Sequence, residues 1–444
     1  MTTLPADWRL LRLDELLAAP LANGRSVKDR PGGFPVLRLT AIRGSRVDLM
    51  QSKAGDWTAE EARQYIVKDG DLLVVRGNGS LPLVGRAGIV GPVTSPVAYP
   101  DTLIRVRTKE DVVSTQYLAL AWKSPALRSQ IENAARTTAG IYKINQRDLS
   151  ALRIPIPPLD EQRRIVDILE DHLSRLDAAD ATIVRSLRRL DLLDEQTVVR
   201  ELLDVANEDV GTALARVVAG DLPKLAEEWE WRPLGSVAEV VGGVTKDAKR
   251  QGDPSFVEVP YLRVANVQRA RLSLESVTTI RVSQQKAAQL RLEPGDVLMN
   301  EGGDRDKLAR GWIWSGEIDD CIHQNHVFRA RPNRDVVHPE WLAWSANTYG
   351  ARWAQRHGKQ SVNLASISLS TIRKMPIPLP SLERQTAGLA RIAHVLDGAK
   401  AMRAALRINV QRSSSLRRAL LVAAFSGRLT GRESDLDLAE ELVG

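Results

Sequence analysis

The second half of the chain repeats the first in a series of short matches that lie about 225 residues apart. The longest match aligns IPIPPLDEQ, residues 154–162, without gaps on IPLPSLERQ, residues 377–385. A period this long exceeds the 20–50 residues of solenoid repeats. The sequence therefore predicts two copies of one domain. The shorter matches pair Asp7-Trp8-Arg9 with Glu230-Trp231-Arg232, Pro35-Val36-Leu37-Arg38-Leu39 with Pro260-Tyr261-Leu262-Arg263-Val264, Gly70-Asp71-Leu72-Leu73 with Gly295-Asp296-Val297-Leu298, Arg105 with Arg329, and Tyr117-Leu118-Ala119 with Trp341-Leu342-Ala343.

Each copy has the pattern of a mixed α/β domain. Short apolar segments such as Pro35–Ile42 and Asp71–Arg76 are bounded by Gly and Pro, which is typical of strands. Longer patches, Ser114–Ala135 and Pro339–Arg356, have helical periodicity. Turns are too frequent for a doubly wound parallel sheet, so we expect an α+β arrangement in both copies.

A long helix is predicted after each Pro-rich junction, from about Asp160 to Leu203 and from about Leu382 to Phe425. Apolar residues recur in both at spacings of three and four, which is the heptad pattern of a coiled coil. At 1.5 Å per residue each helix would be roughly 65 Å long. We expect the helices to pack on each other through Leu169, Leu173, Leu176, Ile183, Leu187, Leu190, Leu389, Ile392, Leu396, Leu406 and Val410.

The charges of the two helical segments are opposite. Residues 161–209 hold seven basic and thirteen acidic side chains, whereas residues 381–428 hold nine basic and two acidic ones. Complementary charge favours pairing of these helices in an antiparallel coiled coil; two long exposed helices, or helices that bind a partner, are the alternatives. The expected order is a first globular domain (1–158), the central helix and its connection (159–222), a second globular domain (223–380), and the distal helix with its tail (381–444).

The composition favours a polyanion as partner and a reducing compartment. The net charge is +7, which suits nucleic acid. The single cysteine, Cys321, excludes an internal disulfide framework and fits the cytoplasm. The sequence has neither an 18-residue apolar run nor the basic and apolar regions of a secretory signal, so we expect a cytoplasmic protein without a membrane partner.

Motifs of catalysis are missing from the sequence, and we expect no catalytic residue in this chain. Gly77-x-Gly79 has Pro82 where a dinucleotide loop needs glycine, and no P-loop occurs. Asp253-Pro254-Ser255-Phe256 resembles an adenine methyltransferase motif, but no glycine-rich cofactor loop accompanies it. Cys321, His323 and His326 lack a fourth ligand at suitable spacing, so a metal site is not expected.

The ordered set of motifs resembles the specificity subunits of type I restriction-modification systems. Two α/β copies, each closed by an IPxPxLxxQ element and a long helix, are similar to that family over essentially the whole chain. The ending Leu420–Leu429 and the segment Gln324–Arg329 fit as well. The chain departs from the family pattern at Glu201–Asp209, which lacks the Ala-Phe-Ser-Gly ending of the second helix.

The resemblance implies a function in DNA recognition. Each copy would be a target recognition domain that reads one half of a bipartite site in double-stranded DNA, and the paired helices would set the spacer. Two methyltransferase subunits would dock on this chain, joined in a restriction enzyme by two translocase-nuclease subunits. S-adenosylmethionine, ATP and magnesium would then serve those partners, and no cofactor is expected here. The alternatives are the recognition subunit of another multisubunit restriction system, or a coiled-coil adaptor that binds only protein.

Candidate DNA contacts lie in loops that combine Gly with Arg, Lys, Asn and hydroxyl groups, the side chains that hold phosphates and read base edges. One loop of each copy follows the Gly-Asp element, and another precedes the Pro-rich junction; an ordinary solvated turn is the alternative for each. A third, weaker candidate is Lys246–Arg250. The expected DNA-binding residues are Arg76, Asn78, Ser80, Arg86, Thr138, Tyr142, Lys143 and Asn145 in the first copy, and Lys246, Asn300, Arg305, Lys307, Arg310, Lys359, Gln360, Ser361 and Asn363 in the second.

Overall fold

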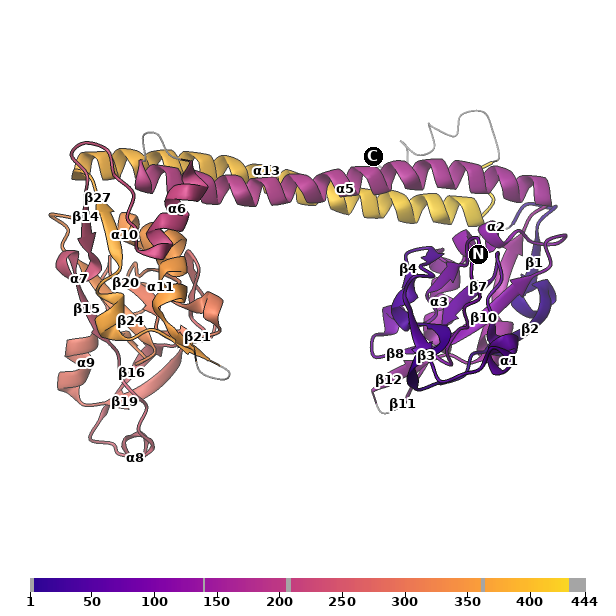
Figure 1. Ribbon diagram of the computed structural model, residues 1–444, viewed down its shortest axis with the longest axis horizontal. Helices are drawn as coiled ribbons and strands as arrows, with labels where there is room; N and C mark the ends of the chain where they lie inside the picture. Colours follow the sequence, from indigo (N-terminus) through magenta and orange to yellow (C-terminus); the bar gives the residue numbers. More distant parts are fainter. Residues whose placement is uncertain (1–3, 139, 205–208, 361–363, 431–444) are drawn as a thin grey trace. The chain divides into compact units, whose positions relative to one another are not determined.

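The computed structural model describes residues 4–138, 140–204, 209–360 and 364–430 (Figure 1). The chain divides into two compact units. Unit 1 joins residues 1–184 to residues 406–444, and unit 2 is residues 185–405. Each unit thus contains one globular domain together with one end of each long helix.

Unit 1 is built around a six-stranded sheet with strand order β2-β10-β7-β9-β5-β4. Its central strand β7 (Leu72–Val75) is buried at every residue, as its unbroken apolar sequence predicts. The other strands of unit 1 are β1 (Arg9–Arg12), β2 (Leu17–Asn23), β3 (Asp29–Leu37), β4 (Ile42–Arg43), β5 (Arg46–Val47), β6 (Ser52–Gly55), β8 (Gly77–Asn78), β9 (Ala87–Ile89), β10 (Leu103–Thr108), β11 (Arg136–Thr138), β12 (Ile141–Lys143) and β13 (Arg153–Ile156); its short helices include α1 (Ala59–Ala62), α2 (Thr115–Ala121), α3 (Pro125–Ala134) and α4 (Gln146–Ser150).

Unit 2 repeats this plan with a four-stranded sheet of order β15-β24-β20-β22. Its strand β20 (Val297–Asn300) is again buried at every residue. The other strands of unit 2 are β14 (Glu230–Pro233), β15 (Ala238–Gly242), β16 (Val257–Leu262), β17 (Val267–Gln268), β18 (Arg271–Leu272), β19 (Thr278–Val282), β21 (Gly302–Gly303), β22 (Gly311–Ile313), β23 (Ile322–His323), β24 (Val327–Pro332), β25 (Lys359–Gln360), β26 (Ala365–Ser366) and β27 (Pro376–Leu379); its helices include α6 (Val210–Ala219), α7 (Leu234–Val237), α8 (Ala248–Gln251), α9 (Gln284–Leu290), α10 (Pro339–Ser345), η6 (Ala346–Gly350), α11 (Ala351–His357) and α12 (Leu369–Ile372).

Two sequence predictions about local structure need correction. The strand expected at Pro35–Ile42 ends at Leu37, because the chain turns through a 3-10 helix at Leu39–Ala41 before β4 begins. The single helical patch expected at Ser114–Ala135 is two helices. Ser124 caps the second helix by accepting a hydrogen bond from the amide of Leu127, and Pro125 begins it; proline has no amide hydrogen with which to continue a preceding helix.

The long helices α5 (Leu159–Leu203) and α13 (Leu382–Phe425) lie at the predicted positions. They run antiparallel within each unit, where basic residues of α13 pair with acidic residues of α5. In unit 1, Arg417 lies 2.8 Å from Asp177. In unit 2, Arg391 lies 2.7 Å from Glu201. The mixed α/β class, the two domains and the two long helices are therefore confirmed. Among the described residues, no helix has the length and apolarity needed to cross a membrane.

Most of the apolar residues expected to join the helices are covered, but Val410 is not. Leu169, Leu173, Leu190, Leu389 and Ile392 are buried, and Leu176, Ile183, Leu187, Leu396 and Leu406 are half-buried. Val410 is 39% exposed, so its assignment is wrong. A straight helix drifts about 20° per heptad from a 3.5-residue repeat, and Asn409 and Ser413 line the groove beside α5 instead.

A buried glutamine fixes the start of each long helix on its own domain. Gln162, fully buried, donates to the carbonyls of Val112 and Pro157 at 3.0 and 2.9 Å and accepts from the amide of Ser114 at 2.9 Å. In unit 2, Gln385 makes the corresponding three hydrogen bonds to the carbonyls of Val336 and Pro380 and the amide of His338. The glutamine of the repeated LxxQ motif therefore fastens the first turn of each long helix to its domain.

The two long helices end differently. Phe425, the last residue of α13, packs edge-on against Tyr117 at 5.3 Å between ring centres, and Gly427 then turns the chain with φ +74°. Because α5 lacks this ending, its buried Leu202 and Leu203 pack in one cluster with Leu214 of α6. Helix α6, which the sequence did not predict, thus completes the core of unit 2.

Candidate nucleic-acid interface

The two candidate loops of unit 1 come together in one small antiparallel sheet. Strand β8 follows the central strand β7, and β11 and β12 form the hairpin before the Pro-rich junction. The strand order is β11-β12-β8, with Tyr142 opposite Asn78 and Lys143 opposite Gly77. Figure 1 shows these strands at the end of the domain that lies away from α5. We call them the small sheet of unit 1.

Free cations surround this sheet. Arg86, Arg136 and Lys143 are exposed and have no ion-pair partner among the described residues. Arg76 is half-buried, and among the described residues its guanidinium makes only a long hydrogen bond of 3.4 Å to the carbonyl of Asp101. Solvated cations of this kind can neutralise phosphates at little cost, because no internal ion pair has to break.

Polar side chains of unit 1 complete the surface. Asn78 uses its carbonyl oxygen to accept from the amide of Ser80 at 3.0 Å, which leaves its amide nitrogen available. Tyr142 is half-buried, and Ser80 is exposed. Asn145 is exposed but caps α4 by accepting from the amide of Asp148. Of Thr138, only the backbone position on β11 is described.

Unit 2 builds the same arrangement, with strand order β21-β26-β25. Lys359 and Gln360 on β25 are exposed, and so is Arg305 in the turn after β21. Lys307 is paired with Asp304, so its charge is partly satisfied within the protein. Arg310 is half-buried, and burial lowers the pKa of its guanidinium. We call these strands the small sheet of unit 2.

Two predicted residues of the second copy, Asn300 and Lys246, lie outside this sheet, and two others lie outside the described residues. Asn300 is fully buried and donates to the carbonyl of Val267 at 2.9 Å, so its assignment as a DNA contact is wrong: it is the last residue of the central strand. Lys246 is exposed in the segment before α8, outside the small sheet. Ser361 and Asn363 lie outside the described residues.

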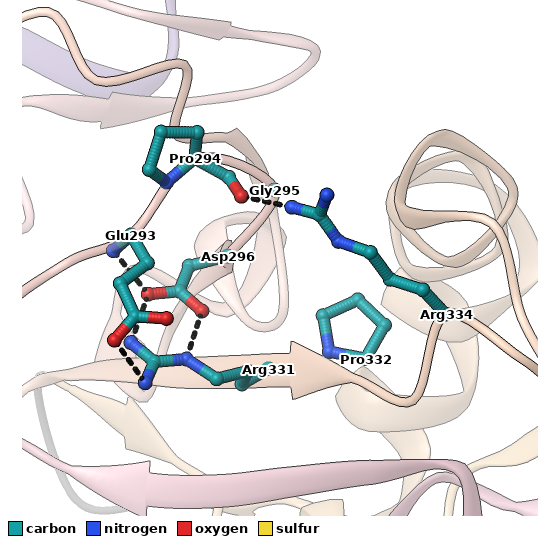
Figure 2. A pocket seen from close by; sticks show the side chains of 7 residues that line it. All are labelled: Glu293, Pro294, Gly295, Asp296, Arg331, Pro332 and Arg334. Atoms are coloured by element: carbon teal, nitrogen blue, oxygen red, sulfur yellow. Dashed lines mark hydrogen bonds and ion pairs between the residues drawn. The ribbon is translucent and has the colours of Figure 1, made fainter.

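The repeated Gly-Asp element lies at the start of each central strand, at the end opposite the small sheet. Asp296 is 1% exposed and accepts two hydrogen bonds from Arg331, at 2.8 and 2.9 Å, which raise the pKa of the arginine. Figure 2 shows the guanidinium held between Asp296 and Glu293, beside a cavity of about 500 Å³. Asp296, Glu293 and Arg331 are thus engaged with one another and Arg334 with the carbonyl of Pro294, so the element is structural.

Cys321 and His323 are buried in the core. Burial raises the pKa of the Cys321 thiol to about 12 and lowers the pKa of His323 to about 4. The Nδ1 atom of His323 lies 2.7 Å from the carbonyl oxygen of Val327. Among the described residues no group of three or more potential ligands could hold a metal ion.

Glu301, an acidic residue beside the small sheet of unit 2, was not among the DNA-binding residues expected from the sequence, although it lies in the loop that follows the Gly-Asp element. Glu301 follows β20 directly, and its Oε2 atom lies 3.2 Å from Nδ1 of His326. Nε2 of this histidine lies 3.3 Å from the side-chain nitrogen of Asn325. The available signal was the 225-residue offset, which aligns Glu301 with Arg76.

Comparisons with known proteins agree with this architecture. Residues 5–183 match the family model of the type I restriction modification DNA specificity domain. The chain is 30% identical over 189 residues to the type I restriction enzyme EcoKI specificity subunit of Escherichia coli (strain K12), a match that covers 42% of this chain and 40% of that one. The match to the EcoBI specificity subunit of Escherichia coli is 20% identical over 437 residues and covers 96% and 87% of the two chains.

Solved structures show the same fold. A chain from a structure on complex assembly and conformational transition of the type I R-M system has a TM-score of 0.72 at 19% identity, covering 96% of this chain and 100% of that one. The HsdS subunit from Thermoanaerobacter tengcongensis has a TM-score of 0.56 at 18% identity, covering 96% and 98%. The chain is thus similar to specificity subunits of type I restriction enzymes in sequence and fold over nearly its whole length, and residues 5–183 match the family's domain model.

Proposed function

We propose that the chain is the DNA-recognition subunit of a type I restriction-modification complex and that each domain reads one half of a split site. The observation that carries the proposal is the small sheet, which recurs in both units and gathers Arg, Lys, Asn and Gln side chains. Basic side chains hold phosphates, whereas Arg, Asn and Gln read base edges in the major groove. The match to the EcoKI subunit spans about 40% of that relative's length, and the whole-length match to the EcoBI subunit extends the argument to both copies.

The partners follow from the same proposal. The chain would dock two methyltransferase subunits and, in a restriction enzyme, two translocase-nuclease subunits. It would be non-catalytic, and S-adenosylmethionine, ATP and magnesium would serve the partners. The paired helices α5 and α13 would set the length of the unread spacer. Two modules joined at a fixed separation reject sites with the wrong gap, as half-site spacing does in dimeric repressors.

Mapping of methylated adenines in the host genome, with and without this gene, tests the proposal. We expect a split motif that disappears on deletion and returns on complementation. Persistence of every methylated motif in the deletion strain would reject the proposed function.

Binding by the purified full chain with its methyltransferase partners gives a second test. The double variant Arg136→Ala/Lys143→Ala should weaken binding of cognate duplex and reduce the salt dependence, by about 0.9 in the log–log slope for each lost phosphate contact. Arg63→Ala is the matched control, because Arg63 is exposed, lies outside the small sheet and has no ion-pair partner among the described residues. A protein-only adaptor would show no salt-dependent affinity for DNA in any of these variants.

A further inference from the structure

Arg76 and Glu301 occupy the same backbone position in the two units. Each directly follows the buried central strand and precedes the first strand of the small sheet. The carbonyl of Arg76 accepts from the amide of Ile144 at 2.9 Å, and the carbonyl of Glu301 accepts from that of Ile367 at the same distance. The amides of both residues donate to a second chain segment, at the carbonyls of Thr102 and His326, at 2.8 and 3.0 Å.

The side chains at this shared position have opposite hydrogen-bonding character. The Arg76 guanidinium can only donate, and one long bond to the Asp101 carbonyl leaves most of its donors available. The Glu301 carboxylate, 26% exposed, can only accept when ionised. His326 lies beside Oε2 at 3.2 Å, and Oε1 has no hydrogen-bond partner in the described part of the chain.

Local hydrogen bonds hold the backbone of each residue beside the small sheet of its unit. Ile144, which binds the backbone of Arg76, directly follows β12. Ile367, which binds the backbone of Glu301, directly follows β26. The backbone at each position is thus tied between the central strand and the small sheet, so that a change of side chain alters the chemistry with little change in the path of the chain.

We propose that this shared position determines the base that each domain accepts. Arg76 donates to a base edge that presents two acceptors, as guanine does through O6 and N7 in the major groove. Glu301 accepts from an exocyclic amino group, which cytosine presents at N4 and adenine at N6. His326 is a positioning residue that holds one carboxylate oxygen and leaves the other for the base. The inference rests on the proposed function and adds to it the base chemistry of each half-site.

Methylation maps of strains that carry Arg76→Gln or Glu301→Gln test the inference. Each variant should lose discrimination at one base position of a single half-site, by about 5- to 150-fold, because a good side-chain pair with a base contributes about that factor. The two variants should affect opposite halves. Glu275→Gln is the matched control, since Glu275 is exposed and forms no ion pair among the described residues.

The outcomes separate the inference from the proposed function. A wild-type strain without a split motif rejects the function, whereas a wild-type motif that both variants retain unchanged overturns the inference. If a variant abolishes methylation, competition between duplexes that differ at single positions, with the purified full chain and its methyltransferase partners, measures base preference directly. Unchanged relative affinities in that assay overturn the inference, and a loss confined to one position supports it.

Discussion

The buried carboxylate of Asp71 accepts two hydrogen bonds from the guanidinium of Arg107, at 2.7 and 2.8 Å. Its Oδ2 atom also accepts from the amide of Lys68 at 2.7 Å, which closes the turn that contains Gly70. Gly70 has φ +78°, a conformation in which glycine has no steric penalty. Together these contacts explain why a Gly-Asp pair recurs at the start of each central strand.

Replacement of this carboxylate should destabilise unit 1. Asp71→Ala leaves the partly buried Arg107 and the amide of Lys68 without their acceptor, and we expect a loss of about 2–4 kcal/mol in the free energy of unfolding. Urea denaturation followed by circular dichroism measures it. Asp56→Ala, which removes an exposed pair with Arg30, should cost less than about 1 kcal/mol. Equal losses in the two variants would contradict the assigned role.

Replacement of Gln385, at the start of α13, should lower the stability of the folded chain. Gln385→Ala removes three hydrogen bonds and leaves buried backbone groups without partners, at a cost of about 2–4 kcal/mol. Thermal unfolding of the full chain measures the effect. Gln411→Ala, at an exposed position of the same helix, is the control and should leave the midpoint nearly unchanged.

The buried His323 predicts a loss of stability on acidification. Its pKa in the folded protein is about 4, below the 6.5 of a free histidine, so the unfolded chain binds a proton between these values that the folded chain does not. Stability should be full above pH 6.5 and fall by about 3 kcal/mol as the pH drops toward 4.

The variant His323→Gln isolates this contribution. Its stability should decline less steeply between pH 6.5 and 4 than that of the wild type, as urea midpoints at several pH values would show. His394→Gln changes an exposed histidine and should keep the wild-type slope. An identical slope in His323→Gln would show that His323 does not titrate in this way.

The paired helices should act as a ruler if the proposed function holds. Deletion of residues 181–187 from α5 and 407–413 from α13 removes one heptad from each helix and keeps Asp180, Arg417, Asp191 and Arg403, which form the neighbouring ion pairs. Seven residues span about 10 Å of helix, or roughly three base pairs of duplex. Methylation mapping should therefore show a spacer shortened by about that amount. An unchanged spacer would contradict the ruler, and deletion from one helix alone should abolish methylation.

The repeated elements could be predicted from the sequence because each is local. The Pro-rich junctions, the heptad spacing and the opposite charges of the long helices placed α5 and α13 to within a residue of their observed starts. Asn300 was misread because its loop motif resembles a turn, whereas strand pairing with β24 buries it. Helix α6 was missed because its packing partners, such as Tyr349 and Trp353, come from a distant part of the chain.

The candidate interface was predicted as separate loops, and its assembly depends on contacts that no local pattern records. The pairing of Tyr142 with Asn78 joins segments 64 residues apart in the chain. In unit 2 the pairing of Gly302 with Ser366 joins segments equally far apart. The positions of Arg305 and Lys359 could be named from their residue types, but the alignment of Glu301 with Arg76 became significant only through their matching backbone hydrogen bonds.

The core of unit 1 includes Leu420, Leu421 and Phe425, which pack with Tyr117 and Leu169. The core of the domain that is synthesised first is thus completed by the end of α13, which is synthesised late. During synthesis Tyr117 and its neighbours lack these packing partners until more than 300 further residues have been added to the chain. Maturation of the first domain is in this way tied to completion of the second, so a nascent chain that stalls between them exposes an apolar surface on which chaperones and proteases act.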